Sequence, residues 1–108
     1  MTDKQLLEIF KALSNETRLH ILQWLKAPDE NFPKKGCVSE DEDPALQGAV
    51  CVCAIGEKAG ISQSTVSQYL ETMERAGLLT LVRRGKWTYY RRNEDTLRAL
   101  SACISTQL

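Results

Sequence analysis

A mainly α-helical domain with one β-hairpin is the fold class that the sequence predicts, on three observations. Apolar residues recur at helical spacing along most of the chain, a glycine-containing turn joins two of these segments, and two β-prone runs flank a Gly-Lys pair. The chain has 108 residues, 43% of them apolar and 26% charged. Because this is the size and composition of one soluble domain, we expect residues 1–108 to share a single core.

The first two helices are predicted from their apolar stripes. Residues 3–13 carry three apolar side chains at positions i, i+4 and i+7, namely Leu6, Phe10 and Leu13. Ser14 is the expected N-cap of a second helix, because its hydroxyl can accept a hydrogen bond from a free backbone amide. Pro28 would end that helix, whose apolar face consists of Leu19, Ile21, Leu22 and Leu25.

Residues 27–48 are predicted to form an irregular acidic insertion within the domain. They contain all three prolines and two of the glycines, and they show no apolar period. Residues 29–43 hold six acidic residues and only two lysines. An insertion of this length either packs through Phe32 or is mobile.

A helix-turn-helix is predicted between residues 50 and 77. Its first helix begins near Val50, and Gly60 follows where a C′ glycine ends many helices. One face of this helix consists of Val52, Ile55 and Ala59. Ser62 would cap the second helix and Gly77 would end it. Its inward face consists of Val66, Leu70 and Met73.

A β-hairpin and a last helix complete the predicted domain. Residues 78–82 and 87–91 form apolar or aromatic arms around a turn at Gly85 and Lys86. The last segment, residues 94–108, carries an apolar stripe of Leu97, Leu100, Ile104 and Leu108. Together these elements predict a winged helix-turn-helix with about five helices.

The local distribution of charge favours double-stranded DNA as the partner, although fourteen basic residues balance fourteen acidic ones overall. Residues 62–92 hold six basic residues and only two acidic ones. Base edges in the major groove would be contacted by Ser64, Ser67 and Gln68. The DNA backbone or minor groove would be contacted by Gln63, Arg83, Arg84 and Lys86. The polar helix face or the basic hairpin alone is equally typical of a solvated surface. A basic hairpin that directly follows a helix-turn-helix favours DNA binding.

Five stretches of the chain match, in order, the motifs of one known family. They are residues 12–22 (ALSNETRLHIL), 51–55 (CVCAI), 62–70 (SQSTVSQYL), 76–79 (AGLL) and 83–90 (RRGKWTYY). Over nearly all of its length outside the insertion, the sequence thus resembles the ArsR/SmtB family of prokaryotic repressors. The resemblance implies a homodimer that pairs through its first and last helices and leaves its operator when an inducer binds.

Homodimerisation is also predicted from the two terminal helices. Their apolar stripes present more apolar surface than three central helices and one hairpin can cover. Two-fold pairing would bury this surface and would set two recognition helices about 34 Å apart on an inverted-repeat operator.

Two positions depart from the family pattern. Tyr69 stands where many relatives carry histidine, so this chain places a phenol beside the recognition helix. Zinc-sensing relatives use aspartate and histidine on the last helix, whereas residues 94–108 contain Asp95 and no histidine. We therefore expect no zinc site on that helix.

Cys51 and Cys53 stand at the Cys-x-Cys sensor position of the family, which implies arsenite or another thiophilic metal ion as inducer. On a regular helix, residues i and i+2 point about 200° apart, so joint binding requires a frayed or unwound helix start. A third thiol would come from Cys37 or from a partly exposed Cys103. Alternatively the pair is structural, since free cysteine is often a small buried residue.

The cellular setting is predicted from what the sequence lacks. No signal peptide and no apolar run of about 20 residues is visible, which predicts a cytoplasmic protein without a membrane partner. In that compartment the four cysteines are expected as free thiols, metal ligands or redox sensors rather than structural disulfides.

Three alternatives stay open. A repressor of this family could sense reactive sulfur or oxidation through Cys103, or lack a metal response. A thiol oxidoreductase is disfavoured because no two cysteines have Cys-x-x-Cys spacing, so we expect no enzymatic activity and no required cofactor. A protein-interaction module would keep the helix-turn-helix for packing only.

Overall fold

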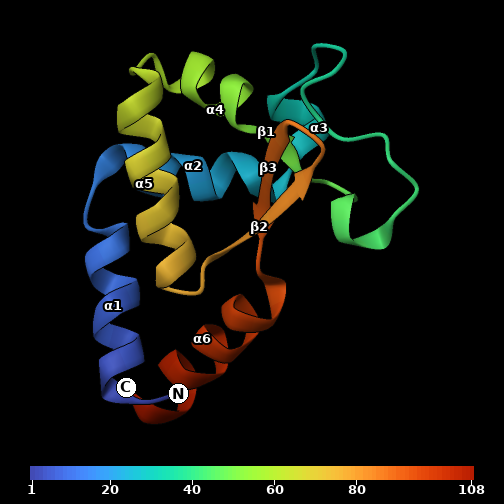
Figure 1. Ribbon diagram of the computed structural model, residues 1–108. Coiled ribbons are helices and arrows are strands. Elements are labelled where there is room, and N and C mark those ends of the chain that lie inside the picture. The colour runs from blue at the N-terminus through green and yellow to red at the C-terminus, as the bar shows by residue number, and fades with distance from the viewer.

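Six α-helices, one 3-10 helix and a three-stranded antiparallel sheet form the fold in the computed structural model, which describes residues 1–108 (Figure 1). The elements are α1 (Asp3–Leu13), α2 (Glu16–Lys26), α3 (Pro28–Asn31), η1 (Pro44–Leu46), β1 (Val50–Cys51), α4 (Val52–Ala59), α5 (Gln63–Arg75), β2 (Leu79–Arg84), β3 (Trp87–Arg92) and α6 (Glu94–Gln107). The predicted class, mainly α-helical with a β-hairpin, is confirmed. In Figure 1, α1 and α6 lie at the end of the molecule opposite α4, and both chain termini lie there.

Side-chain caps define where the first two helices begin. Thr2 and Gln5 form a reciprocal capping box on α1, with N···O distances of 2.8 and 3.1 Å. The prediction that Ser14 caps α2 is wrong. Asn15 is the N-cap, because its side-chain oxygen accepts from the Arg18 amide at 3.0 Å. The Ser14 hydroxyl instead donates to the Phe10 carbonyl at 2.6 Å and closes α1.

The insertion at residues 27–48 is folded against the domain. Phe32 is buried, so the segment packs through this ring, which was one of its two expected states. Two further anchors were not predicted: Leu46 of η1 is buried, and Val38 forms an antiparallel bridge with Val50. The acidic residues between these anchors are thereby held beside the sheet.

The helix-turn-helix of α4 and α5 forms where the sequence predicts it. Gly60 adopts a φ of 68°, a left-handed conformation that glycine reaches without strain, and it ends α4. Ser62 then caps α5 by accepting from the Thr65 amide at 3.2 Å. The inner face of α5 is fully buried and consists of Val66, Leu70 and Met73.

The sheet contains one strand more than predicted. β2 and β3 pair from Leu79↔Arg92 to Arg84↔Trp87 and form the hairpin, here called the wing. β1 pairs with the other side of β3 through Val50↔Tyr90 and Cys51↔Tyr89, so the chain is extended where a helix was expected to start. The predicted first helix of the motif therefore begins at Val52 rather than near Val50.

The terminal helices bury only part of their predicted apolar stripes. α1 buries Leu6, Ile9 and Ala12, whereas Phe10 of the predicted stripe is 41% exposed and its neighbour Leu7 is 58% exposed. On α6, Leu100 and Cys103 are buried and Ile104 is 48% exposed. Periodicity reveals an apolar stripe but not which part of it the chain itself covers. Both helices thus retain an apolar face without a partner in this chain.

On α2 one residue of the predicted apolar face, Leu19, is 38% exposed. The other three predicted residues of that face, Ile21, Leu22 and Leu25, are buried. Along the whole chain, none of the helices has the length and apolar content that crossing a membrane would require.

Candidate nucleic-acid interface

The outward face of α5 carries the residues that the sequence assigned to base contacts. Gln63, Ser64 and Gln68 are exposed, and Ser67 is half-buried. The Ser64 hydroxyl lies 3.3 Å from that of the capping Ser62, at the amino end of the helix. Because the opposite face of α5 is buried in the core, these polar side chains are the part of the helix available to a partner.

The wing places its basic residues next to this helix. Arg83, Arg84 and Lys86 are all exposed at the end of the hairpin, around the turn at Gly85. A φ of 59° at Gly85 suits the first central position of a tight hairpin turn. The Lys86 ammonium lies 5.5 Å from the ring centre of Trp87, which is itself exposed.

One pocket brings the recognition helix, the wing and the thiol pair together. It has a volume of about 310 Å³ and is lined from α5 by Gln63 and Ser67 and from the wing by Arg83 and Lys86. Cys51 and Cys53 line the same pocket from β1 and α4. Four predicted DNA-contacting residues and both predicted ligands therefore surround a single space, whereas Ser64, Gln68 and Arg84 do not line it.

Cys51 and Cys53 lie on either side of the start of α4. Cys51 is the N-cap residue with an extended backbone (φ −62°, ψ 136°), and Cys53 is exposed in the first helical turn. The negative charge of the Cys51 thiolate, together with burial, raises the pKa of Cys53 above its usual value. The two thiols are therefore neighbours at the start of α4, where the extended backbone of Cys51 departs from regular helix geometry.

The other two cysteines occupy different surroundings. The Cys51 amide donates to the Cys37 carbonyl at 2.8 Å, so the backbones of these two residues are adjacent. Cys103 is buried in α6, and its thiol donates to the Gln107 side chain at 2.8 Å. The expected partial exposure of Cys103 is therefore wrong. No three side chains among histidine, cysteine, aspartate and glutamate form a ready-made metal site.

Arg18 connects α1 to the recognition helix, which the sequence did not indicate. Its guanidinium lies 5.1 Å from the ring centre of Tyr69, and its Nε donates to the Ala12 carbonyl at 2.7 Å. Tyr69 of α5 thus provides an aromatic face for a cation from α2. Tyr69, which stands where many relatives carry histidine, therefore has the Arg18 guanidinium as its partner.

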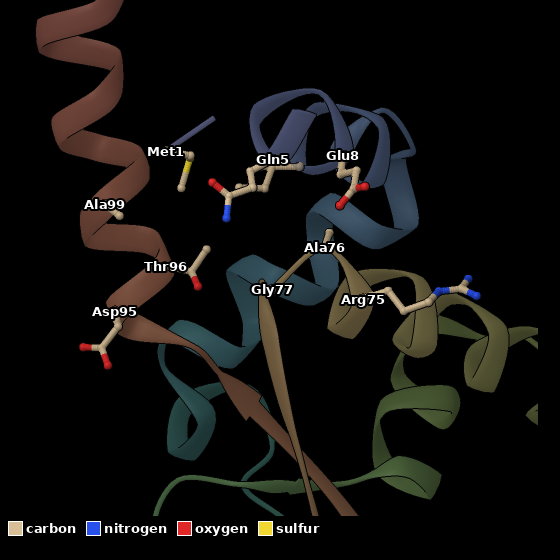
Figure 2. Close-up of a pocket in the computed structure, with 10 residues that line it drawn as sticks. Met1, Gln5, Glu8, Arg75, Ala76, Gly77, Asp95, Thr96 and Ala99 are labelled. Atoms are coloured by element: carbon tan, nitrogen blue, oxygen red, sulfur yellow. The ribbon is translucent and has the colours of Figure 1, made fainter. Parts of the chain in front are cut away.

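The largest cavity lies away from this interface, among α1, α6 and the end of α5 (Figure 2). It has a volume of about 500 Å³, and its charged walls include Glu8, Arg75 and Asp95. In Figure 2 the ends of Arg75 and Asp95 point away from each other, and Asp95 pairs instead with Arg98. These charged groups do not converge on one point, so the cavity lacks the polar arrangement typical of a catalytic site.

We predict that iodoacetamide modifies the cysteines in order of exposure, with Cys53 first and Cys103 last. Because the thiolate is the reactive form and the pKa of Cys53 is raised, the rate at Cys53 should still be increasing with pH above pH 7. Cys51→Ser removes the neighbouring thiol that raises the pKa of Cys53, so it should speed the reaction of Cys53 at alkaline pH. Peptide mapping by mass spectrometry measures each rate, and equal rates for all four cysteines would contradict these burial assignments.

Comparison with known proteins agrees with this geometry. Residues 46–80, which include the helix-turn-helix, match the family model described as "Bacterial regulatory protein, arsR family". The uncharacterized HTH-type transcriptional regulator YbzH of Bacillus subtilis (strain 168) is 48% identical over 103 residues, which cover 94% of this chain and 97% of YbzH. The chain belongs to the ArsR family.

Two further relatives place this ArsR-family chain in context. The putative arsenical resistance operon repressor ArsR2 of Halobacterium salinarum is 32% identical over 90 residues, covering 83% of this chain and 60% of that protein. The solution structure of a homodimeric winged helix-turn-helix DNA-binding domain, Mb0332 from Mycobacterium bovis, superimposes with a TM-score of 0.62 at 27% identity. That alignment covers 97% of this chain and 87% of the Mb0332 domain.

The ArsR-family membership decides the general class of function. This protein has the winged helix-turn-helix fold and is a DNA-binding transcriptional regulator. Both the fold and the relatives are those of regulators rather than of enzymes, so the thiol oxidoreductase alternative is rejected.

Proposed function

We propose that this ArsR-family regulator is a homodimeric repressor that leaves an inverted-repeat operator when a thiophilic ion binds Cys51 and Cys53. The observation that carries the proposal is the pocket of about 310 Å³ that these thiols share with Gln63, Ser67 and the wing. Any ligand held by the thiols lies beside side chains that would contact DNA. An inducer bound to the thiols and the operator DNA would therefore compete for the same surface of the protein, the one around this pocket.

In the DNA complex, the exposed amino end of α5 enters the major groove. Ser64, Ser67 and Gln68 contact base edges, since hydroxyl and amide groups can donate to and accept from them. Gln63, Arg83, Arg84 and Lys86 contact the DNA backbone or the minor groove, which fixes the register of the helix without reading sequence.

The matched variants Gln68→Ala and Arg83→Ala test this division of roles. Arg83 makes no ion pair within the chain, so its loss should weaken binding to all duplexes about equally and lower the salt slope by about 1. Gln68→Ala should instead change which sequences are recovered when the protein selects inverted repeats from a random duplex pool. The assignment fails if both variants select and bind as the wild type does.

Homodimerisation is supported by the apolar faces that α1 and α6 leave uncovered. Leu7 and Phe10 on α1 and Ile104 on α6 are large, apolar and exposed. The M. bovis relative, which shares this fold, is described as a homodimer. A second copy of the chain would bury the exposed residues and place two copies of α5 on one duplex.

Arsenite is the inducer that the thiol pair and the relatives favour together. Several relatives are described as repressors of arsenical resistance operons. Cys51 and Cys53 would supply two sulfur ligands, and each thiol proton would leave with an arsenite hydroxyl as water. Cys37 is the better candidate for a third sulfur than Cys103, because its backbone adjoins Cys51 whereas Cys103 is buried in α6. An ion held by both thiols would constrain the first turn of α4.

Arsenite titration of the reduced protein, followed by sulfur-to-arsenic absorbance, tests the ligand assignment. Cys51→Ser and Cys53→Ser should each remove most of the signal, and Cys37→Ser should weaken it. Cys103→Ser is the matched control and should behave as the wild type. In the wild type alone, arsenite should weaken duplex binding about tenfold. An unchanged titration with Cys51→Ser/Cys53→Ser would exclude this site.

A further inference from the structure

The acidic insertion makes a direct contact with the wing. We call residues 39–43 the acidic arm; four consecutive carboxylates, Glu40 to Asp43, lie in it. The Arg84 guanidinium donates to the Asp43 carboxylate, and its Nε lies 3.8 Å from the carboxylate of Asp41. The arm therefore engages one of the basic side chains assigned above to the DNA backbone.

The arm is held in position by contacts on both sides. Asp43 caps η1 by accepting from the Ala45 amide at 3.0 Å, and η1 is anchored by the buried Leu46. The Asp43 amide in turn donates to the Asp41 carboxylate at 2.8 Å. The Ala45 amide and Arg84 together lower the pKa of Asp43 below its usual value, so its carboxylate is charged at neutral pH.

The chemistry of this contact matches that of a DNA backbone contact. A guanidinium binds carboxylate and phosphate oxygens with the same set of N–H donors. Arg84 cannot donate fully to both, because its guanidinium faces Asp41 and Asp43 in the free chain. Both carboxylates and Arg84 are about half-exposed, and an exposed ion pair of this kind is weak enough for DNA to displace.

We propose that the acidic arm takes the place of a DNA phosphate on Arg84, so that the free protein partly inhibits its own binding to DNA. This inference rests on the proposed function, since it requires the wing to contact the DNA backbone. Binding then displaces Asp41 and Asp43 from Arg84, and a protein whose arm cannot engage Arg84 binds DNA more tightly.

Two matched double variants separate this contact from a general effect of charge. Asp41→Asn/Asp43→Asn removes the two carboxylates that face Arg84, and asparagine at position 43 can still cap η1. Glu40→Gln/Glu42→Gln removes the same charge from the same arm without touching Arg84. Affinity for a duplex of arbitrary sequence is measured by fluorescence anisotropy at low salt, because a backbone contact requires no operator. Thermal unfolding verifies that both variants are folded.

We expect Asp41→Asn/Asp43→Asn to bind about fivefold more tightly than Glu40→Gln/Glu42→Gln. In an Arg84→Ala background this difference should vanish, because the shared partner is gone. Equal gains for the two variants would show that only charge matters, and weaker binding by Asp41→Asn/Asp43→Asn would show that the arm positions Arg84 for DNA. Either result overturns the inference. Absence of wild-type binding to any duplex would instead refute the proposed function.

Discussion

The double variant Phe10→Glu/Ile104→Glu is expected to be monomeric and to bind an inverted-repeat duplex about a hundredfold more weakly than the wild type. Phe10 is 41% exposed on α1 and Ile104 is 48% exposed on α6, so the monomer itself loses little packing. Four carboxylates would meet in the proposed homodimer, and their desolvation opposes association. Each monomer would then bind only one half-site. The affinity gained when a dimer binds two half-sites at once would be lost.

Leu19→Glu provides the matched control for that variant. Leu19 is 38% exposed, close to the value for Phe10, but it lies on α2 rather than on a terminal helix. Its substitution should leave sedimentation and duplex affinity unchanged. If Phe10→Glu/Ile104→Glu sediments as the wild type does, the proposed pairing through α1 and α6 is wrong.

Leu70→Ala is expected to lower the free energy of unfolding by about 2–5 kcal/mol. Leu70 has no exposed surface, and it packs in the core between the other buried residues of α5, Val66 and Met73. Truncation removes apolar contacts and leaves a cavity where α5 meets its neighbours. Because a domain of this size has a total stability of about 5–15 kcal/mol, the loss is a large part of it. Urea unfolding followed by circular dichroism measures the change.

Gln68→Ala serves as the stability control on the same helix. Gln68 is exposed, so its replacement should change the free energy of unfolding by less than about 0.5 kcal/mol. A loss below about 1 kcal/mol for Leu70→Ala would contradict the position of α5 in the core. The two variants thereby distinguish residues that hold the helix from those that face a partner.

Most of the fold could be predicted because its signals are local. The stop at Gly60, the cap at Ser62 and the hairpin turn at Gly85 each act within a few residues, and the structure contains all three. The sequence does not distinguish two adjacent residues that could both cap the same helix. Ser14 and Asn15 both suit an N-cap. The Asn15 side chain accepts from the Arg18 amide, whereas the Ser14 hydroxyl donates back to Phe10, so Asn15 is the cap.

The candidate site was predictable only in part. The extended backbone at Cys51 was not predicted, because the apolar pattern indicated a helix from about Val50; the spacing of the two thiols showed only that joint binding of one ion would require an unwound helix start. The contact between Arg84 and Asp43 joins residues 41 positions apart. Neither the apolar periodicity nor any local motif in the sequence indicates such a contact. The adjacency of Cys37 and Cys51 likewise depends on how the insertion pairs with β1.

The short strand β1 shortens the route by which a captured ion could signal. Cys51 pairs directly with Tyr89 of β3, so the backbone of one proposed ion ligand and the strands of the wing belong to the same sheet. An ion bound at Cys51 would therefore act on the wing through this strand pairing, without first moving α5. Release from the chromosome would then begin with a tilt of the hairpin, and the recognition helix would follow.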